Sequence, residues 1–435
     1  MKTTYLLLLS LFLTQTSRAD HYDGRTESGA SSRSVSLAEI TAVVLANNPA
    51  IQEAVSNWEA KKNRITQEAA WDDPKVSATQ RLARFVNVSR NAFTDESVSI
   101  EQAIPLSGKN RSRARIAAAE AVAAYEDVRR QELDVVTKTR VAYFHLTNAG
   151  AQLELNEKNE KSLRQIAEIG RSRYEVGTQT AAQVLMAEIE ASKLQETRRD
   201  LENNVATSQS QLNVLMNRDA FALVGRPVPV APNPISLQRE KLRSLALSHR
   251  PEVLIARARV TAQKSNLELA HRAWIPDPSL TVQGQRYNGA AEGVSELDAG
   301  ISFNVPWGNA RKYSAGVKES RANLAGAEHA LERAQTEAVG MLRDALQKAE
   351  TARHHVELFR DKLVPQGRQA FEASQFSYEA GKSDFPEWIG AQRTLRDLES
   401  SEREHLRDYL VALAELESVV GTDLGIFGGE MKKLK

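Results

Sequence analysis

The segment Ser107-Gly108-Lys109-Asn110 carries the residue types of a phosphate-binding loop. Such a loop requires another glycine five residues before Gly108, and a serine or threonine after the lysine to ligate magnesium. The sequence has Ala103 and Asn110 at these two positions. The segment therefore does not predict nucleotide binding.

Metal binding and catalysis are not predicted either. The chain has no cysteine, which excludes disulfides, thiolate metal sites and lipid attachment at an N-terminal cysteine. His354 and His355 are neighbours in a predicted helix, so their side chains point in different directions. No methionine cluster, no Ser/His/Asp set and no pair of carboxylates at a credible site emerges. We therefore expect no enzyme activity and no cofactor.

Two short motifs instead mark the ends of two very long predicted helices. Tyr174-Glu175-Val176-Gly177 ends the stretch 106–176, and Tyr378-Glu379-Ala380-Gly381 ends the stretch 309–380. Both stretches are rich in Ala, Glu, Arg, Gln and Leu, which favour helix. At ~1.5 Å per residue, each would span roughly 105 Å. Helices of this length indicate an elongated protein that spans a long distance, and they do not indicate an enclosed active site.

The same order of residues occurs twice in the chain, at an offset of about 200 residues. We interpret the chain as a tandem duplication of units 36–225 and 236–425, joined by a Pro-rich linker at 226–235. The corresponding pairs are Asn48-Pro49 with Arg250-Pro251, Trp71 with Trp274, Pro105 with Pro306, and Gly108 with Gly308. The last two pairs mark the predicted strand-to-helix turn of each unit.

Each unit is predicted to run helix, strand, strand, long helix, helix. The strands are expected at about 75–86, 96–104, 279–288 and 296–305, where apolar and polar residues alternate most clearly in the last. About ten residues is the length of a tilted strand that crosses a bilayer. The helices after the two glycines repeat apolar residues at 3-4 spacing, which is typical of a coiled-coil seam.

The predicted lengths also indicate where the strands lie. In each unit the two shorter helices together nearly match the long helix, so they can stack end to end beside it. All four strands then lie at one pole and the turns at Gly177 and Gly381 at the other. Four strands cannot close into a barrel, because single-chain barrels begin at about eight. In the hydrocarbon of a membrane every backbone N–H and C=O needs a hydrogen-bond partner within the protein. We therefore expect the strands of several copies to form one closed barrel around a water-filled interior.

The start of the chain indicates a secreted protein, and its charge does not indicate nucleic-acid binding. Residues 1–19 read as a signal peptide, 20–35 as a flexible tail and 426–435 as a C-terminal tail. No later stretch has the ~18 apolar residues of a membrane-spanning helix. Without residues 1–19 the net charge is about −1, and no basic excess indicates nucleic-acid binding.

The duplication, the segment Gln102-Ala103-Ile104-Pro105-Leu106-Ser107-Gly108-Lys109 and the two Tyr-x-x-Gly tips resemble the outer-membrane efflux family. These are the TolC-like channel components of tripartite pumps in Gram-negative bacteria. The resemblance covers nearly all of the mature chain. It implies a mainly α fold with a β membrane part: a homotrimer with one twelve-stranded barrel and an α-helical barrel of ~100 Å through the periplasm. A periplasmic adaptor and an inner-membrane RND transporter are the implied partners, together with outer-membrane lipid.

The resemblance also implies roles for residues at the two tips, which in the family close the periplasmic aperture and dock the adaptor. Tyr378 and Glu387 match the aromatic and acidic positions of the family, whereas Ser383 replaces a basic residue and Gln183 an acidic one. The candidate gate residues are Tyr174, Gly177, Gln183, Tyr378, Gly381, Ser383 and Glu387. The contact between charged tip residues that keeps the aperture closed in the family, here called the charged latch, is either weaker in this chain or rebuilt from other residues. The candidates are Arg171, Arg173, Lys382 and Asp384. Alternatively, Tyr174 and Tyr378 simply pack the tip.

The Pro105-Leu106-Ser107-Gly108-Lys109 segment is similar to the subgroup that serves heavy-metal exporters, which implies metal cations as the substrate. The expected function is an exit duct that is gated by untwisting of the tip helices on adaptor contact. Two alternatives stay open. One is a type I protein-secretion or drug-efflux conduit of the same fold. The other is a secreted coiled-coil scaffold without a pore.

Overall fold

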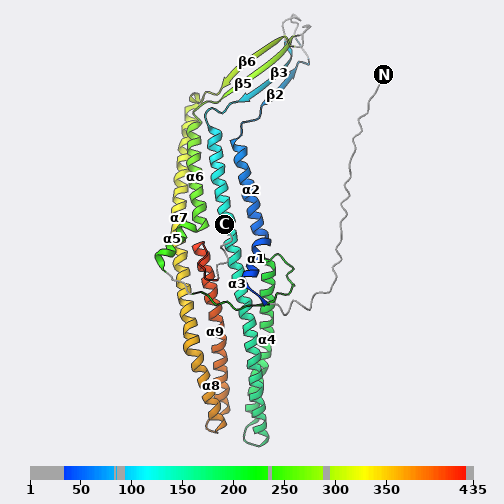
Figure 1. The fold of residues 1–435 in the computed structure, drawn as a ribbon, viewed down its shortest axis with the longest axis vertical. Coiled ribbons are helices and arrows are strands. Elements are labelled where there is room, and N and C mark those ends of the chain that lie inside the picture. The colour runs from blue at the N-terminus through cyan, green and yellow to red at the C-terminus, as the bar shows by residue number, and fades with distance from the viewer. Residues whose placement is uncertain (1–33, 83–84, 86–93, 234–237, 288–293, 428–435) are drawn as a thin grey trace, which may run out of the picture.

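The computed structural model describes residues 34–82, 85, 94–233, 238–287 and 294–427. The predicted signal peptide, most of the N-terminal tail, residues 234–235 of the linker and the end of the C-terminal tail lie outside the described residues. The described chain is an elongated helical body that carries a small sheet at one pole (Figure 1). Two helical hairpins extend side by side from the body to the opposite pole, where each ends in a turn.

The helices and strands occur in the same order in the two repeats. The first repeat contains α1 (Leu37–Asn47), α2 (Pro49–Ala69), β2 (Lys75–Gln80), β3 (Thr94–Ala103), α3 (Lys109–Glu175) and α4 (Ala181–Leu215). The second contains α5 (Arg239–His249), α6 (Pro251–Arg272), β5 (Pro278–Tyr287), β6 (Glu296–Phe303), α7 (Ala310–Leu358), a π-helix (Phe359–Leu363), α8 (Val364–Glu379) and α9 (Phe385–Val420). A short 3-10 helix, η2 (Pro306–Asn309), precedes α7.

Each repeat begins with a short helix that the sequence analysis did not predict. Helix α1 starts at a capping box, in which the Glu39 backbone N–H donates to Ser36 Oγ (3.2 Å) and the Ser36 N–H donates to Glu39 Oε2 (2.9 Å). Proline then occupies the first position of α2 and of α6, where its missing N–H costs no hydrogen bond. The chain therefore stops and restarts a helix at Pro49 and at Pro251.

The four strands form one antiparallel sheet in the order β2-β3-β5-β6, so the two repeats meet where β3 pairs with β5. One rung across the sheet is Val76, Ile100, Val282 and Ala299, and the next is Ser77, Ser99, Gln283 and Asp298. Neighbouring residues of a strand point to opposite faces. One face of the sheet is therefore apolar over its middle rungs, with Gln80, Glu96 and Arg286 at one end, and the other face is polar. Among the described strands of a single copy, β2 and β6 are the edges.

Two strands are shorter than predicted. Strand β2 ends at Gln80, where its pairing with β3 stops at Glu96, instead of at residue 86. Residues 83–84 and 86 lie outside the described residues. Strand β6 ends at Phe303 instead of residue 305, because Pro306 starts the 3-10 helix. Strand β5 begins one residue earlier than predicted, and residue 288 is not among the described residues.

The predicted tails and the linker contribute packed residues to the middle of the molecule. Strand β1 (Ser34–Val35) pairs in parallel with β4 (Arg226–Pro227), although these residues were assigned to a flexible tail and a linker. The buried Tyr143 hydroxyl of α3 donates to Val35 O (3.0 Å) and Val228 O (2.7 Å). Two residues of the predicted C-terminal tail, Ile426 and Phe427, are buried against this core. The tails pack here because their apolar side chains cover α3.

Among the described residues, no helix has a stretch apolar enough to cross a membrane. Within the same part of the chain, no three histidine or acidic side chains are placed to hold a metal ion.

Candidate functional site

The two tip turns require their glycines. Gly177 and Gly381 have φ angles of 76° and 68°, in the left-handed region that disfavours residues with a Cβ. Their backbone N–H groups donate to Tyr174 O (2.9 Å) and Tyr378 O (3.0 Å), which closes the last turn of each long helix. The chain then reverses into α4 and α9.

Tyr378 joins the tip of the second repeat to the tip of the first. Its side chain is only 6% exposed, and its ring stacks on Trp388 at 5.0 Å between centroids. The Arg173 guanidinium lies 4.4 Å from the centroid of the Tyr378 ring, and the Tyr378 hydroxyl donates to Gln179 Oε1 at 2.8 Å. Arg173 and Gln179 both belong to the α3–α4 tip. The contact therefore holds the two hairpins together.

An apolar cluster supports this contact from both hairpins. It combines small and branched side chains of α3 and α4 with three aromatic side chains and one isoleucine of α8 and α9: Leu163, Ile166, Ala187, Ala191, Leu194, Tyr378, Phe385, Trp388 and Ile389. Tyr174 occupies the equivalent place in the first motif but is 50% exposed. The two tyrosines of the repeated motif thus have different environments.

The remaining candidate gate residues lie around this contact. Gln183 Oε1 accepts a hydrogen bond from the Thr180 backbone N–H (3.2 Å), so this side chain caps α4. Ser383 is partly buried in the second turn, and Glu387 is exposed on the first turn of α9. Four charged residues were considered for a rebuilt latch. Arg173 contacts the Tyr378 ring of the other tip. The other three, Arg171, Lys382 and Asp384, are exposed.

The strand-to-helix turns lie at the opposite end of the helices. Gly108 has a φ angle of 72° and precedes α3; Arg272 Nη1 lies 2.6 Å from where a Cβ would be. The Gly108 N–H donates to Pro105 O (3.4 Å). The corresponding Pro306 and Gly308 form part of the 3-10 helix before α7. The two repeats therefore build this turn differently.

Asp277 ties the two repeats together beside Gly108. Its carboxylate accepts hydrogen bonds from the Ser107 N–H (2.7 Å), the Ser107 hydroxyl (2.8 Å) and the Lys109 ammonium (2.8 Å). Burial raises the pKa of Asp277, but these hydrogen bonds outweigh it and hold the pKa below its ordinary value. The Ser-Gly-Lys motif thus serves as a clamp between the start of α3 and the start of β5.

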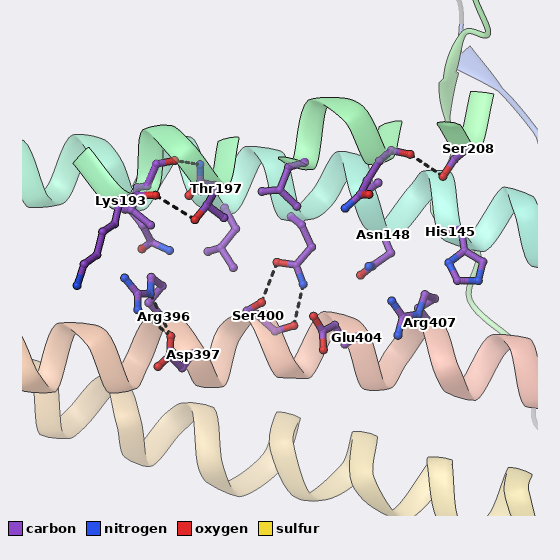
Figure 2. Close-up of a pocket in the computed structure, with 18 of the residues that line it drawn as sticks. His145, Asn148, Lys193, Thr197, Ser208, Arg396, Asp397, Ser400, Glu404 and Arg407 are labelled. Atoms are coloured by element: carbon purple, nitrogen blue, oxygen red, sulfur yellow. Dashed lines mark hydrogen bonds and ion pairs between the residues drawn. The ribbon is translucent and has the colours of Figure 1, made fainter. Parts of the chain in front are cut away.

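A polar cleft of about 880 Å³ lies above the tips, between α3, α4 and α9 (Figure 2). Helix α3 lines it with an amide row, Asn148, Gln152, Asn156 and Asn159, at spacings of four, four and three residues. The Gln152 amide donates to Ser400 O (2.9 Å) and accepts from the Ser400 hydroxyl (3.0 Å). This cleft was not predicted from the sequence, although the amide side chains at seam spacing in α3 were a signal for it.

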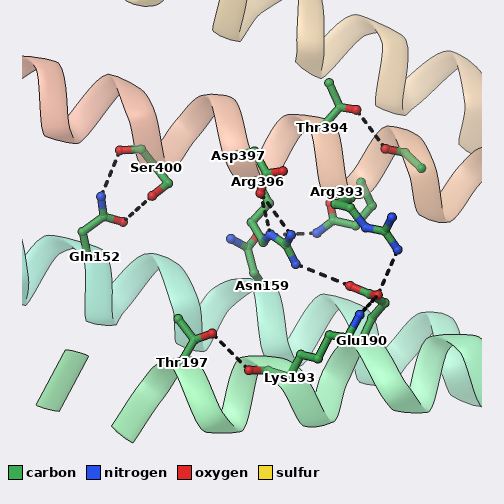
Figure 3. A network of polar contacts seen from close by, with 12 residues as sticks. Gln152, Asn159, Glu190, Lys193, Thr197, Arg393, Thr394, Arg396, Asp397 and Ser400 are labelled. Carbon is green, nitrogen blue, oxygen red and sulfur yellow. Dashed lines mark hydrogen bonds and ion pairs between the residues drawn. The ribbon is translucent and has the colours of Figure 1, made fainter. Parts of the chain in front are cut away.

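Ion pairs of the nearly buried Glu190 carboxylate connect α4 to α9 across the cleft (Figure 3). Glu190 of α4 is 7% exposed. Arg393 Nη2 and Arg396 Nη1 of α9 lie 2.9 and 3.7 Å from its oxygens, and Lys193 Nζ of α4 lies 2.9 Å away. Burial raises the pKa of Glu190, but Lys193 and Arg393 outweigh it and lower the pKa below its ordinary value.

A duplicated chain with a small sheet at one pole and two helical hairpins that meet at the other is the build of a channel-forming protein. The profile described as "Outer membrane efflux protein" matches residues 42–218 and 242–422, and the chain belongs to this family. The family resemblance and the mainly α fold with a β part are confirmed. The protein is therefore an outer-membrane efflux channel and not an enzyme, with its long helical part in the periplasm.

Three known proteins illustrate the relationship. The toluene efflux pump outer membrane protein TtgF of Pseudomonas putida is 25% identical over 401 residues, 87% of this chain and 81% of TtgF. The outer membrane protein TolC of Escherichia coli is 21% identical, over 85% of this chain and 81% of TolC. The solved outer-membrane channel OprN superposes with a TM-score of 0.77 at 16% identity, over 89% of this chain and 90% of OprN.

Proposed function

We propose that three copies of this chain assemble into the exit duct of a tripartite efflux pump. The observation that carries this proposal is the sheet, which has one mainly apolar face, one polar face and two edges that no other strand of the described residues pairs with. An edge strand that faces lipid would leave N–H and C=O groups unsatisfied. Pairing β6 of one copy with β2 of the next removes both edges, and three copies give a twelve-stranded barrel. The apolar face then contacts lipid, and the polar face lines the lumen.

The tips are proposed to close the periplasmic entrance. The Tyr378 contact with Arg173 and Gln179 holds the α8–α9 hairpin against the α3–α4 hairpin. An opening motion that separates the hairpins must break this contact. We propose that a periplasmic adaptor triggers it and connects the duct to an inner-membrane RND transporter.

We propose metal cations as the cargo. The polar sheet face supports this proposal because Glu101, Glu296 and Asp298 outnumber Lys75 there. The resemblance to the heavy-metal subgroup rests on the Ser107-Gly108-Lys109 segment, whose contacts with Asp277 already give it a structural role, so it adds little support. Because the relative TtgF is named for toluene efflux, organic solvents are the second candidate cargo.

Two measurements test the proposal. The purified protein in detergent is expected to have the mass of a trimer and to form ion-conducting pores in a planar bilayer; a monomer without conductance contradicts the duct. A strain that lacks the gene is expected to become sensitive to metal salts. Sensitivity to toluene alone supports solvent as the cargo, and loss of a secreted protein supports type I secretion.

A further inference from the structure

The long rod of the second repeat is interrupted, whereas the rod of the first is not. Helix α3 runs for 67 residues without a break. The α7–α8 rod changes to a π-helix over Phe359–Leu363, directly before Val364 and Pro365. Proline has no N–H for the helical ladder, and the π turn accommodates the extra residue that the ladder cannot pair. The rod of the second repeat thus has one weak point.

The weak point divides the second hairpin into a fixed part and an arm. The Phe359 ring packs against His405 of α9 at 4.5 Å between centroids, which marks where α9 passes the π-helix. Beyond it, α8 and the first half of α9 form the arm that ends at Gly381. The arm packs internally, as in the Arg368–Glu399 ion pair (3.2 Å). It can therefore move as a unit.

The apolar cluster and the Gln152–Ser400 hydrogen bonds hold the arm to α3 and α4, together with two contacts of charged side chains at different heights. The lower contact is Tyr378 at the tip. The upper contact is Glu190 of α4 with Arg393 and Arg396 of α9, between the tip and the π-helix (Figure 3). If the arm moved away, Glu190 would lose both arginines and keep Lys193 alone. Separating a carboxylate from the cations that it contacts in a nearly buried site costs free energy, because charge-assisted hydrogen bonds are strong. This contact therefore opposes opening.

We propose that Glu190 with Arg393 and Arg396 is a second latch, separate from the tip, and that the π-helix Phe359–Leu363 is the hinge on which the α8–α9 arm moves when the latch opens. The inference rests on the proposed duct. It assigns closure to a charged contact in the wall of the helical body, twelve to fifteen residues beyond the tip glycines.

The first test measures open probability in planar bilayers. Glu190→Gln and Arg393→Gln are each expected to raise it at least threefold, and the double variant no further, because the two residues act through one contact. The control is Arg198→Gln, which removes ion pairs with Glu157 and Glu202 inside the α3–α4 hairpin. Wild-type open probability in both single variants overturns the latch. A wild-type protein that forms no pores at all instead contradicts the proposed duct.

The second test fixes the latch covalently. The chain has no cysteine, so Glu190→Cys with Arg393→Cys introduces one reactive pair. Cross-linking with a short bismaleimide is expected to reduce the conductance at least fivefold. The control pair, Glu188→Cys with Ser192→Cys, lies one turn apart on α4 and is exposed. Full conductance of the cross-linked latch pair contradicts the proposal.

The third test concerns the hinge. Deleting Arg360 removes one residue from the π-helix and restores a regular α-helix without rotating α8. In that background, Glu190→Gln is expected to raise open probability less than 1.5-fold. Arg360→Ala removes the same side chain but keeps the π turn, and it should preserve the full effect. An equal effect of Glu190→Gln in both backgrounds contradicts the hinge.

Discussion

Tyr174 and Tyr378 occupy the same place in the same four-residue motif, yet one is 50% and the other 6% exposed. The difference comes from Arg173, Gln179 and Trp388, which surround only the second ring. The sequence predicted both tyrosines as tip residues. It could not assign them different roles, because their neighbours come from another hairpin or from beyond the turn.

Tyr378→Ala is expected to raise the conductance of the duct several-fold, because it removes the ring that Arg173 and Trp388 contact. Tyr378→Phe loses only the hydrogen bond to Gln179, worth about 1 kcal/mol, and should have a smaller effect. Tyr174→Ala is the matched control. Bilayer recordings that show the same increase for both alanine variants would remove the Tyr378 contact from the gate.

Asp277→Asn is expected to lower the thermal midpoint, because it weakens the hydrogen bonds from Lys109 and Ser107 by about 2 kcal/mol in total. The pKa of Asp277 is lower in the folded protein than its ordinary value. Its contribution is therefore complete above the unfolded pKa and is lost as the pH falls through the folded pKa. Thermal scans from pH 7 downwards should show a difference between wild type and variant that shrinks once the pH falls below the unfolded pKa. A constant difference contradicts the assignment.

At the scale of helices and strands, the sequence predicted the extent of the two long rods, because their composition and their terminal glycines are strong local signals. It predicted the second rod as one unbroken helix and missed the π-helix Phe359–Leu363. It missed α1, α5 and the β1–β4 ladder. Strand β1 is two residues long and exists because Tyr143 binds Val35 O and Val228 O. It missed the latch for the same reason, since Glu190 and Arg393 are 203 residues apart. Contacts between distant segments leave no periodic pattern.

Ile426→Ala is expected to lower the thermal midpoint by several degrees. The side chain is fully buried, and such truncations cost about 2–5 kcal/mol. Leu223→Ala provides the control, because Leu223 is 54% exposed. Differential scanning fluorimetry of both variants distinguishes a packed C-terminal segment from a loose one. Equal midpoints for both variants would show that this segment does not stabilise the core.

For the whole molecule, the sheet faces predict how the duct enters the membrane. Val282 and Gln283 are neighbours in β5 that point to opposite faces. Val282→Lys is expected to reduce insertion, because a lysine on the lipid face near mid-bilayer costs about 2–4 kcal/mol. Gln283→Lys should insert normally and shift the ion selectivity towards anions. Membrane fractionation and reversal potentials measure the two effects. Equal insertion of both variants contradicts the assignment of the faces.

The two edges of the sheet belong to different repeats: β2 comes from the first and β6 from the second. Copies that join β6 to β2 form a ring in one direction only, and every protomer is needed to complete it. A proline placed within β6 would therefore disable not just its own chain but every ring that it enters. If half the chains carried it and copies mixed freely, only about one ring in eight would be intact, so such a variant is expected to be dominant in cells that also make the wild type.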